Sequence, residues 1–378
     1  MNVVKNVLII SATDTIGGAE IVLYDFLKEN RFHNFYILTS NNKMIEKGYK
    51  DVLGDKVFCS KVLSGYNFKG NPILTFYRLI FALLEIKKIV KEFSIDILYG
   101  NNTKDFVILV FYKIFIDPKI KTVAHIHDML TEKIHRVFLH NFASKIDLFI
   151  TPSKACAEKL IGADVDKNKI KCIYNGIQYS TKYIRNYYDK KHIINIFFIG
   201  SICRLKRPDI FIDVLNILNE LSSITFNGYI IGPVLEKSCF EETEKKIKCA
   251  KNKGIIKYLG SIPHKKLLSD IYPNIDILFL SSDKDTLPTV ILEAMSFGKV
   301  VVARNVDGVP EMISDGIDGI IFKYTATPNE IAEKILFYIA DNDFLNDISY
   351  AAYLKIREKF SNNIKKEKIN WLIENNCF

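Results

Sequence analysis

Short apolar segments of strand length alternate with helical stretches along this 378-residue chain, and they form two separate series. The first series contains "NVLIIS", "NFYILT", "DILYG", "KTVAHIH", "LFITPS" and "KCIYNG". After the polar stretch at 180–192, the second series contains "NIFFIGS", "FNGYIIG", "IIKYLGS", "ILFLSS", "KVVVAR" and "GIIFK". Fully apolar short strands that alternate with helices predict parallel sheets with helices on both faces. The chain is therefore predicted to be an α/β protein with two doubly wound domains in tandem.

The domain boundaries follow from this pattern, because 378 residues are more than one compact domain usually holds. We expect the first domain to occupy 1–185 and the second 190–360. The tail, 361–378, is predicted to be a closing helix that packs back on the first domain. Ligands of doubly wound sheets bind beyond the carboxyl ends of the strands, so the loops that follow the strands are the places to search.

The composition and the cysteine count argue against several classes of protein. With 48% hydrophobic and 25% charged residues, the sequence is that of an ordinary globular protein. The seven cysteines form no CxxC pair and are odd in number, which argues against a disulfide framework or a zinc knuckle and favours a reducing compartment. The N-terminus, "MNVVKNVLIIS", is interpreted as a first strand rather than a signal peptide. We therefore expect a cytoplasmic protein.

The net charge of +9 comes largely from lysine and leaves two interpretations open. It favours an anionic ligand or an anionic membrane surface, or it serves solubility alone. The most apolar stretch, 106–116, is interrupted by Lys113 and is too short to span a bilayer. The stretch 76–93 has apolar residues at helical spacing together with Arg78, Lys87, Lys88 and Lys91. It predicts either a helix packed on a sheet or a peripheral helix on the inner face of the cell membrane.

The loop after the first predicted strand contains a pair of glycines. Gly17 and Gly18 stand just before a predicted helix in "SATDTIGGAEIVLYDFL". Glycines let the backbone approach a ligand closely, and free amides at a helix N-terminus attract phosphate. The dinucleotide-binding pattern GxGxxG is not present here, and a glycine pair often does no more than make a turn.

The segment "AHIHD" ends another predicted strand. Strand alternation puts His125 and His127 on the same face, with Asp128 next in the loop. His-x-His occurs in metallohydrolases, but no His or Asp follows at the spacing such sites use, so we expect no metal. We favour His127 as a single functional histidine at the strand end, facing a cleft between the domains. Buried structural histidines are the alternative.

A basic loop opens the second series in "IGSICRLKRPDIF". Arg204, Lys206 and Arg207 follow a strand immediately and precede a helix that starts near Pro208. Arg pairs with phosphate in a bidentate manner, whereas Lys acts as a point charge, so these side chains suit a diphosphate. A solvated basic loop is the alternative.

The stretch "SSDKDTLPTVILEAMSFGKVVVARNVDGVPEMI", at 281–313, is predicted to be a loop, a helix and a strand. Pro288 suits a first helical turn, where the amides around Leu287, Thr289 and Val290 remain free at the positive end of the helix. Glu293, one turn further in, is placed to accept two hydroxyls of a ribose. Asp285 is then left to hold hydroxyls of a transferred group. "DKD" at 283–285 also matches a DxD metal motif, but a match of three residues is common by chance.

The same stretch resembles the E-x7-E signature of retaining glycosyltransferases with the GT-B fold, specifically glycosyltransferase family 4. Asp285 stands for the first glutamate of that signature, "LPTVILEAM" matches its centre, and Glu293 is the second glutamate. The downstream "VDGVPEMISDGIDGIIF" is similar to the next motif of the family. Weaker matches follow in the family's order: "GGAE", "HD", "TPS", "YNGI", "KRPD", "IIG" and "YLGSIP".

The resemblance implies a GT-B fold, in which two Rossmann-like domains face each other across a cleft. It implies that the first domain binds the acceptor and the second binds a nucleotide diphospho-sugar. By position, Gly17 and Gly18 approach the diphosphate or acceptor, and His127 lies near the transferred sugar. The remaining donor contacts fall on Arg204, Lys206, Thr286, Leu287, Pro288, Thr289, Val290 and Glu293. His127, Lys206 and Asp285 are counted as the catalytic residues. Asn175 and Gly176, in "YNGI", are expected to form an acceptor or structural loop.

The sequence departs from the family pattern at two places. Where the family usually has Gly-Arg, this chain has Gly200 and Ser201, so Arg204 is expected to take the place of the absent arginine. The first glutamate of the signature is shortened to Asp285, and the glycine after it is Thr286. The second departure alters the end of the pocket that receives the sugar.

The predicted reaction is sugar transfer from a nucleotide diphospho-sugar to an acceptor hydroxyl, with retention at the anomeric carbon, no cofactor and no dedicated metal. The expected partners are that donor and a saccharide or lipid-linked saccharide acceptor of surface polysaccharide or glycolipid synthesis, with no nucleic acid. The enzymatic alternative is a GT-B sugar-phosphate epimerase or phosphorylase. The non-enzymatic alternative is a catalytically degenerate GT-B module that binds sugars, which the changes at Ser201 and Asp285 keep open.

Overall fold

The computed structural model of the chain describes residues 4–14, 16–64, 71–127, 133–178, 183, 192–250 and 254–375. It divides into two compact units, one made of Met1–Gly176 with Asn362–Phe378 and the other of Ile177–Ser361. The polar stretch between the two series of strands is described only at Tyr183 and His192. The Tyr183 hydroxyl lies 3.0 Å from Ser349 Oγ, so this point of the linker is fastened to the second unit.

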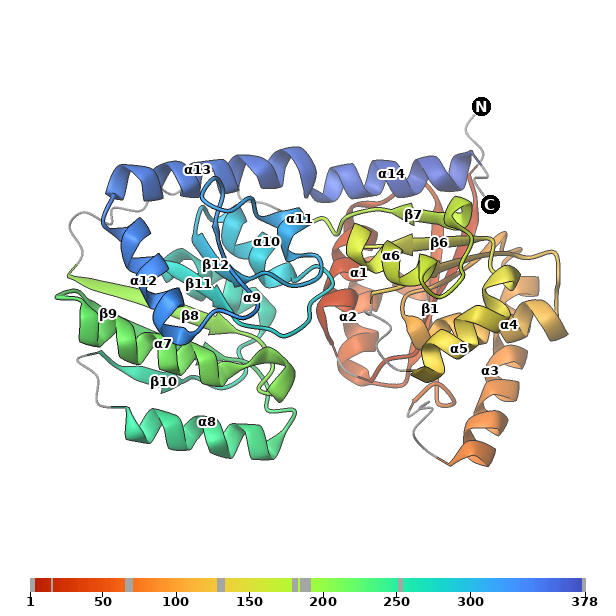
Figure 1. Cartoon of the computed structure of the whole chain (residues 1–378). Helices are drawn as coiled ribbons and strands as arrows, with labels where there is room; N and C mark the ends of the chain where they lie inside the picture. Colours follow the sequence, from red (N-terminus) through yellow and green to blue (C-terminus); the bar gives the residue numbers. More distant parts are fainter. Residues whose placement is uncertain are drawn as a thin grey trace. The chain divides into compact units, whose positions relative to one another are not determined.

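The first unit contains a seven-stranded sheet in the order β3-β2-β1-β4-β5-β6-β7 (Figure 1). Every strand pairing in it is parallel. The strands are β1 (Asn6–Ser11), β2 (Asn34–Ser40), β3 (Val57–Ser60), β4 (Ile97–Gly100), β5 (Lys121–His125), β6 (Leu148–Thr151) and β7 (Ile170–Cys172). The strand order reverses between β1 and β4, and in open α/β sheets such a reversal marks the edge where ligands bind.

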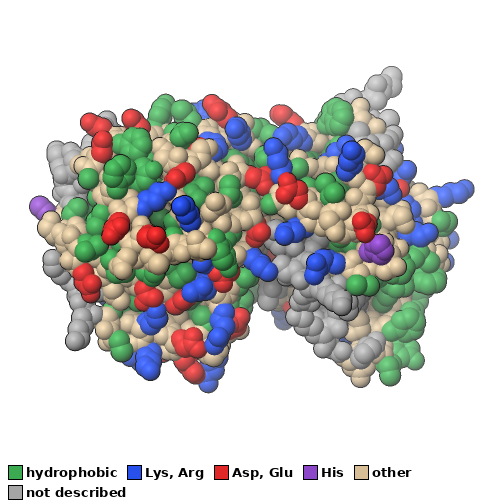
Figure 2. All heavy atoms as spheres, viewed as in Figure 1, with side chains coloured by type: hydrophobic (Ala, Val, Ile, Leu, Met, Phe, Trp, Pro, Cys, Tyr) green, Lys and Arg blue, Asp and Glu red, His purple; other side chains and the backbone are tan. Residues whose placement is uncertain are grey.

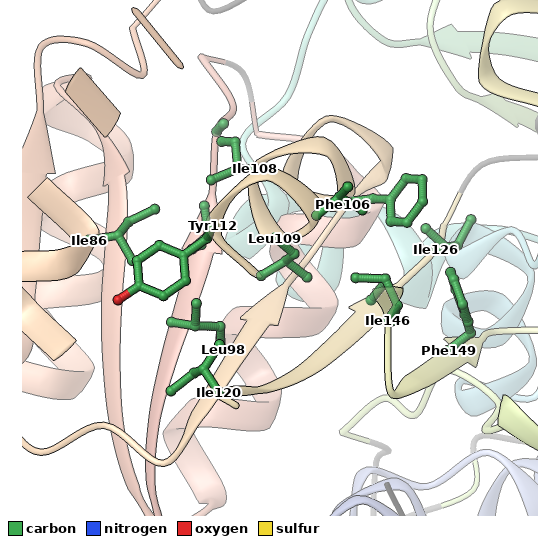
Figure 3. Close-up of a cluster of buried hydrophobic side chains, with 14 of the residues drawn as sticks. Ile86, Leu98, Phe106, Ile108, Leu109, Tyr112, Ile120, Ile126, Ile146 and Phe149 are labelled. Atoms are coloured by element: carbon green, nitrogen blue, oxygen red, sulfur yellow. The ribbon is translucent and has the colours of Figure 1, made fainter. Parts of the chain in front are cut away.

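Helices cover both faces of this sheet, as the apolar strands predicted. They are α1 (Gly18–Glu29), α2 (Lys43–Leu53), α3 (Pro72–Glu92), α4 (Thr103–Phe115), α5 (Lys133–Phe142), α6 (Lys154–Ile161) and α14 (Asn362–Glu374). Alternation along β1 sends Leu8 and Ile10 into a core with α3 and α4, whereas Val7 and Ile9 enter a core with α1, α2 and α14. Figure 3 shows the first of these cores, where Ile86 of α3, Tyr112 of α4 and Leu98 of β4 pack together.

The second unit repeats the architecture with a six-stranded parallel sheet in the order β10-β9-β8-β11-β12-β13. Its strands are β8 (Ile193–Ile199), β9 (Thr225–Ile231), β10 (Ile256–Tyr258), β11 (Ile277–Leu280), β12 (Val300–Arg304) and β13 (Ile320–Phe322). The helices are α7 (Pro208–Leu221), α8 (Lys237–Cys249), α9 (His264–Lys266), α10 (Thr289–Ser296), α11 (Val309–Met312), α12 (Pro328–Ile339) and α13 (Asn342–Lys359). The order reverses between β8 and β11, so the loops after these strands lie at the expected ligand edge.

The two stretches considered for a membrane both belong to helices of the first unit. The apolar stretch 106–116 forms most of α4, and its residues from Phe106 to Val110 are buried in the core beside the sheet. The stretch 76–93 forms most of α3. Within the part of the chain that the structure describes, no helix combines the length and the apolarity needed to cross a bilayer.

Candidate functional site

The carboxyl edge of the second sheet brings together two charged side chains from distant loops. Lys206 lies in the loop after β8, and Asp285 lies in the loop after β11, the strand beside β8. Parallel strands end at the same edge, so these loops meet although 79 residues separate the two side chains. Lys206 Nζ donates to Asp285 Oδ2 at 2.5 Å, and both side chains are largely buried. The predicted phosphate-binding cation is thus held by the predicted sugar-binding carboxylate.

The main chain at Asp285 is fixed by the loop that follows β12. Its N–H donates to Asp307 Oδ2 at 3.0 Å, and its carbonyl accepts from the Gly308 N–H at 3.2 Å. Asp307 has a φ of 40°, and Arg207, beside Lys206, has a φ of 54°. Positive φ is uncommon for residues other than glycine, and such residues cluster at functional sites. Each of the two loops that frame the ion pair thus contains a residue other than glycine with positive φ.

The N-terminus of α10 lies directly after Asp285. The helix begins at Thr289, and Pro288 is its N-cap residue with extended backbone, one position earlier than the first-turn place expected for it. Leu287 and Pro288 are buried, whereas Thr286, Thr289 and Val290 are half-buried. The amides of Thr289 and Val290 stand in the first turn, where a helix has no acceptor of its own. Together with the helix dipole, they form a site that favours an anion.

Glu293 is 5% exposed and both of its carboxylate oxygens are engaged. Oε2 accepts a short hydrogen bond from the Tyr272 hydroxyl, and Oε1 lies 2.8 Å from His264 Nε2. Burial and the nearby carboxylate raise the pKa of Tyr272 well above its ordinary value, so the phenol remains a proton donor. Tyr272 and His264 thus each contact one oxygen of the carboxylate that is predicted to hold a ribose.

Sequence reasoning did not identify Tyr272 or His264. They come from "PHKKLLSDIYPN", 21 and 29 residues before Glu293, and no spacing rule connects them to α10. The weak match "YLGSIP" ends at Pro263, directly before His264. It was the one signal in the sequence analysis that lay next to this loop.

Arg204 does not join the ion pair of Lys206 and Asp285 in this structure. Its guanidinium pairs with Glu242 of α8 at 3.0 Å, and both side chains are about two-thirds exposed. Its main-chain N–H donates to Glu236 Oε2. Arg204 instead lines a hollow of about 410 Å³ with Glu242, Lys246 and residues of α7. Exposed ion pairs contribute little, so this contact restrains Arg204 only weakly.

The carboxylate of Asp283, the first residue of "DKD", is engaged by two guanidinium groups. Arg304 Nη1 makes a short contact with its Oδ1, and Arg207 Nη1 lies 3.6 Å from the same oxygen. Arg207 also forms a bidentate pair with Asp209. Cations thus occupy the position that the DxD interpretation gives to a metal. In the described ranges, no group of three or more His, Cys, Asp or Glu residues is placed to hold a metal ion.

The glycine pair of the first unit begins α1. Gly17 is the N-cap residue, and its N–H donates to Glu20 Oε2 at 2.9 Å in a capping box. Its φ of −118° is open to any residue, so the backbone conformation does not require glycine here. A Cβ at Gly17 would come 3.2 Å from the Glu20 carboxylate, which already occupies this helix end. The predicted approach of a diphosphate or acceptor to Gly17 and Gly18 stays a prediction.

The two histidines of "AHIH" lie together at the end of β5, on one face as strand alternation predicts. Their ring centroids are 3.9 Å apart. His125 is buried, and its Nδ1 lies 2.6 Å from the Tyr99 hydroxyl, whereas His127 is half-buried just beyond the strand. Burial and the nearby Lys365 lower the pKa of His127 to about 3, and burial lowers the pKa of His125 well below its ordinary value. Both imidazoles are therefore neutral at physiological pH. Asp128 lies outside the described residues.

Lys365 is a third titratable group near these histidines, and sequence reasoning missed it. It belongs to α14, is 3% exposed, and its Nζ lies 5.8 Å from the centre of the Phe26 ring. Burial lowers its pKa to about 7, against the opposite influence of Asp25. The sequence around Lys365 contains no pattern that predicts a buried lysine.

Asn175 and Gly176 lie where the chain leaves the first unit. Asn175 is buried, the Ile173 N–H donates to Thr151 O, and the Ile177 N–H donates to Phe360 O. Gly176 is the last residue of this segment of the first unit. These contacts hold the residues on either side of the pair, and the role of Asn175 and Gly176 stays a prediction.

Two family descriptions match this chain over most of its length. The model described as "Glycosyltransferase Family 4" matches residues 16–180, and the model described as "Glycosyl transferases group 1" matches residues 184–355. An uncharacterized glycosyltransferase of Methanocaldococcus jannaschii is 24% identical and covers 94% of this chain and 92% of its own length.

Two further proteins carry names that specify a ligand. The N,N'-diacetylbacillosaminyl-diphospho-undecaprenol alpha-1,3-N-acetylgalactosaminyltransferase of Campylobacter jejuni is 33% identical over 90 residues, which are 24% of this chain and 23% of that protein. The crystal structure of HepE from Anabaena, in complex with UDP and glucose, superimposes with a TM-score of 0.81 at 20% identity. It covers 98% of this chain and 100% of its own, and it shows that this chain has the same fold.

Proposed function

We propose, from the premise that this chain belongs to the GT-B glycosyltransferases of the family 4 type, that it transfers a sugar from a nucleotide diphospho-sugar to an acceptor hydroxyl with retention at the anomeric carbon. One observation carries the proposal: the second unit places Lys206, Asp285, the first turn of α10 and Glu293 along one edge of its sheet. Asp285 for the sugar, Lys206 with the first turn of α10 for the diphosphate, and Glu293 for the ribose then follow the order of sugar, diphosphate and ribose in a nucleotide sugar.

The leaving diphosphate binds between Lys206 and the first turn of α10 in this proposal. Preorganised donors aimed at developing negative charge are worth most in a site with little water, and both groups are in place before the donor arrives. Asp285 keeps Lys206 Nζ at one position, so the lysine gives up little side-chain freedom when the phosphate binds. The shorter Asp285 then meets the sugar hydroxyls on the side away from Lys206.

The reaction itself is proposed to be a displacement on one face of the sugar, in which the leaving phosphate helps to deprotonate the acceptor. The neutral His127 suits a hydrogen-bonding role toward the sugar rather than a cationic one, since its pKa is lowered to about 3. Lys206 and the α10 dipole stabilise the charge of the leaving group, and we propose that this happens without a dedicated metal.

The donor is proposed to be a UDP-sugar, and the acceptor a saccharide on a lipid carrier. The first point is supported by the UDP bound to HepE of Anabaena, and the second by the name of the Campylobacter jejuni relative. We place the protein in surface polysaccharide or glycolipid synthesis, in the cytoplasm and peripherally on the inner face of the cell membrane.

The test is thermal stabilisation by a panel of nucleotides and nucleotide sugars, with divalent metal or with EDTA. A ligand at a hundred times its dissociation constant should raise the free energy of unfolding by about 2.7 kcal/mol. We expect UDP and one UDP-sugar to give this shift equally in EDTA. Absence of a shift with every nucleotide, or a shift that needs metal, would contradict the proposal.

Asp285→Asn tests the proposed role of this carboxylate, and assays of the wild type separate the proposal from its rivals. It removes the charge that meets Lys206 and the sugar, so transfer should fall about a hundredfold while UDP binding changes little. A sugar-phosphate epimerase would convert the donor without an acceptor, a phosphorylase would need inorganic phosphate, and a degenerate binding module would bind UDP-sugar with no turnover in the wild type.

A further inference from the structure

The outer face of α3 exposes an unusual number of large apolar side chains. Seven of them, each between 38% and 68% exposed, lie in the stretch 73–84 of this helix: Ile73, Leu74, Phe76, Tyr77, Ile80, Phe81 and Leu84. Figure 2 shows hydrophobic side chains gathered over this helix. Soluble proteins seldom leave a large contiguous apolar patch in water unless it binds something.

Packing against the sheet does not account for this face. The residues of α3 that enter the core are Leu79, Ala82, Leu83, Ile86 and Ile89. At 100° per residue these form one side of the helix, and the seven exposed residues form the opposite side. The helix is thus apolar on both sides over 73–84, whereas a helix that only covers a sheet would be polar on its outer side.

The same outer face becomes basic where its apolar part ends. The stripe that begins at Ile73, Tyr77, Ile80 and Leu84 continues, at spacings of three and four residues, through Lys87 to Lys91. Lys88 lies beside this stripe, and all three lysines are exposed. The acidic residues of α3, Glu85 and Glu92, lie off the centre of the stripe. One face therefore combines an apolar part with three positive charges.

The topology places the apolar part at the functional edge of the first unit. The helix α3 follows β3 and leads to β4, which lies parallel to the other strands, so α3 begins at the carboxyl edge of the sheet. His127 and the glycines that begin α1 lie at the same edge. A lipid-linked acceptor would thus have its lipid near the apolar half of α3 and its saccharide near the site.

We propose that the exposed face of α3 docks this protein on an anionic phospholipid bilayer, with Ile73 to Leu84 in the interface and Lys87, Lys88 and Lys91 against the headgroups. The proposal deepens the proposed function, since the choice of a membrane fits a lipid-linked acceptor. Charge complementarity favours a bilayer over a second copy of the chain, because two such lysine clusters would repel each other across a symmetric interface. The basic residues also predict dependence on anionic lipid.

The test is sedimentation of the full chain with vesicles of phosphatidylcholine alone and vesicles that also contain phosphatidylglycerol. The apolar variant, Leu74→Ser with Phe81→Ser and Leu84→Ser, is compared with a control of the same composition on the second unit, Leu221→Ser with Leu235→Ser and Phe337→Ser, all of them exposed. The basic variant, Lys87→Gln with Lys88→Gln and Lys91→Gln, is compared with the exposed Lys237, Lys323 and Lys359 changed in the same way.

We expect the wild type and both controls to bind the phosphatidylglycerol vesicles at low salt and the apolar variant to lose that binding. Each lysine neutralised in the basic variant should lower the partition coefficient about fivefold. Binding of the apolar variant equal to that of the wild type, or no binding of the wild type, would overturn the proposal. So would a dimer of the wild type, seen by ultracentrifugation, that the apolar variant abolishes without any vesicle binding.

The nucleotide shift distinguishes failure of this inference from failure of the proposed function. If UDP-sugar stabilises the wild type but the protein does not bind vesicles, the enzyme assignment stands and the proposed membrane surface is wrong. A wild type that binds vesicles through α3 but is stabilised by no nucleotide keeps the surface and removes the enzyme assignment.

Discussion

At the scale of single residues, the carboxylate of Glu293 is the most tightly defined group of the site. A buried carboxylate is costly unless its oxygens are hydrogen-bonded, and Tyr272 and His264 supply those contacts. The same contacts fix the direction of the remaining lone pairs, which a ribose would use. The pair of contacts thus serves both the stability of α10 and the binding of a nucleoside.

Glu293→Gln tests that role with little change of shape. Loss of a hydrogen bond to a charged group should weaken UDP binding about ten- to a hundredfold. The preference for UDP over 2'-deoxy-UDP should shrink at the same time, because the carboxylate is proposed to accept from the ribose hydroxyls. Isothermal titration of both nucleotides with both proteins measures the two effects.

Tyr258→Phe is the control, since it removes a phenol that donates to Gly232 O elsewhere on the same sheet. It should leave the preference for UDP over 2'-deoxy-UDP unchanged. If Glu293→Gln keeps the full preference of the wild type, Glu293 does not bind the ribose.

The contacts among site residues were the part that the sequence could not supply. Glu293, Lys206 and Asp285 were identified by motif and by their place after a strand or in a first helical turn. That Lys206 pairs with Asp285 depends on which two strands are neighbours, and that Arg204 turns toward Glu242 depends on where α8 packs. Such choices are made by tertiary proximity, which spacing along the chain does not encode.

At the scale of elements, these strands were predictable because a strand that is buried on both faces is a continuous apolar run in the sequence. Each apolar run became a parallel strand, from "NVLIIS" as β1 to "GIIFK" as β13. Helices were harder, since the apolar spacing of 76–93 fits both a buried helix and a surface helix. The structure shows that α3 has both characters, one on each side.

The helix α14 carries the most unusual buried charge, Lys365. Its pKa is lowered to about 7 in the folded protein by burial, whereas an unfolded lysine titrates near 10.4. Between these values the unfolded chain binds the extra proton, so the free energy of unfolding rises with pH from about 7 upward. Below pH 7 both states are protonated, and the full cost of the buried charge remains.

Lys365→Met should therefore stabilise the protein most at neutral pH and less as the pH rises. We expect the gain in unfolding free energy to shrink by about 3 kcal/mol between pH 7 and pH 9.5. Urea unfolding of wild type and variant at both pH values gives this difference, in which the other titrating groups cancel. Lys365 interacts electrostatically with Asp25, His125 and His127, and Tyr99 contacts His125.

Lys368→Met is the matched control on the same helix, because Lys368 is exposed and its ammonium is already in water. Its effect should not depend on pH. A gain from Lys365→Met that is equal at both pH values would mean that Lys365 is not a buried charge in the native protein.

At the scale of the whole molecule, the chain builds its first unit from both of its ends. Residues of α14 enter the core that contains Val7 of β1 and Ile150 of β6, although more than 350 residues separate Val7 from Ile369. The second unit lies between these segments in the sequence and has its own core. Each unit thus has hydrophobic packing of its own. A destabilising substitution in one unit should therefore affect mainly the segments of that unit.

Hydrogen exchange measured peptide by peptide tests whether the two units unfold separately. It also tests which unit binds the nucleotide. Ile373→Ala removes a buried side chain of the core that contains Val7 in the first unit and should cost about 2–5 kcal/mol, so exchange should rise in β1, β5 and β6. Ile335→Ala, the control in the core of the second unit, should raise exchange in β8, β11 and β12. UDP should slow exchange around Lys206 and α10 in the wild type and in Ile373→Ala alike. Protection by UDP confined to β1, β5 and the start of α1 would instead place the nucleotide on the first unit and contradict the assignment of the donor to Lys206 and Glu293.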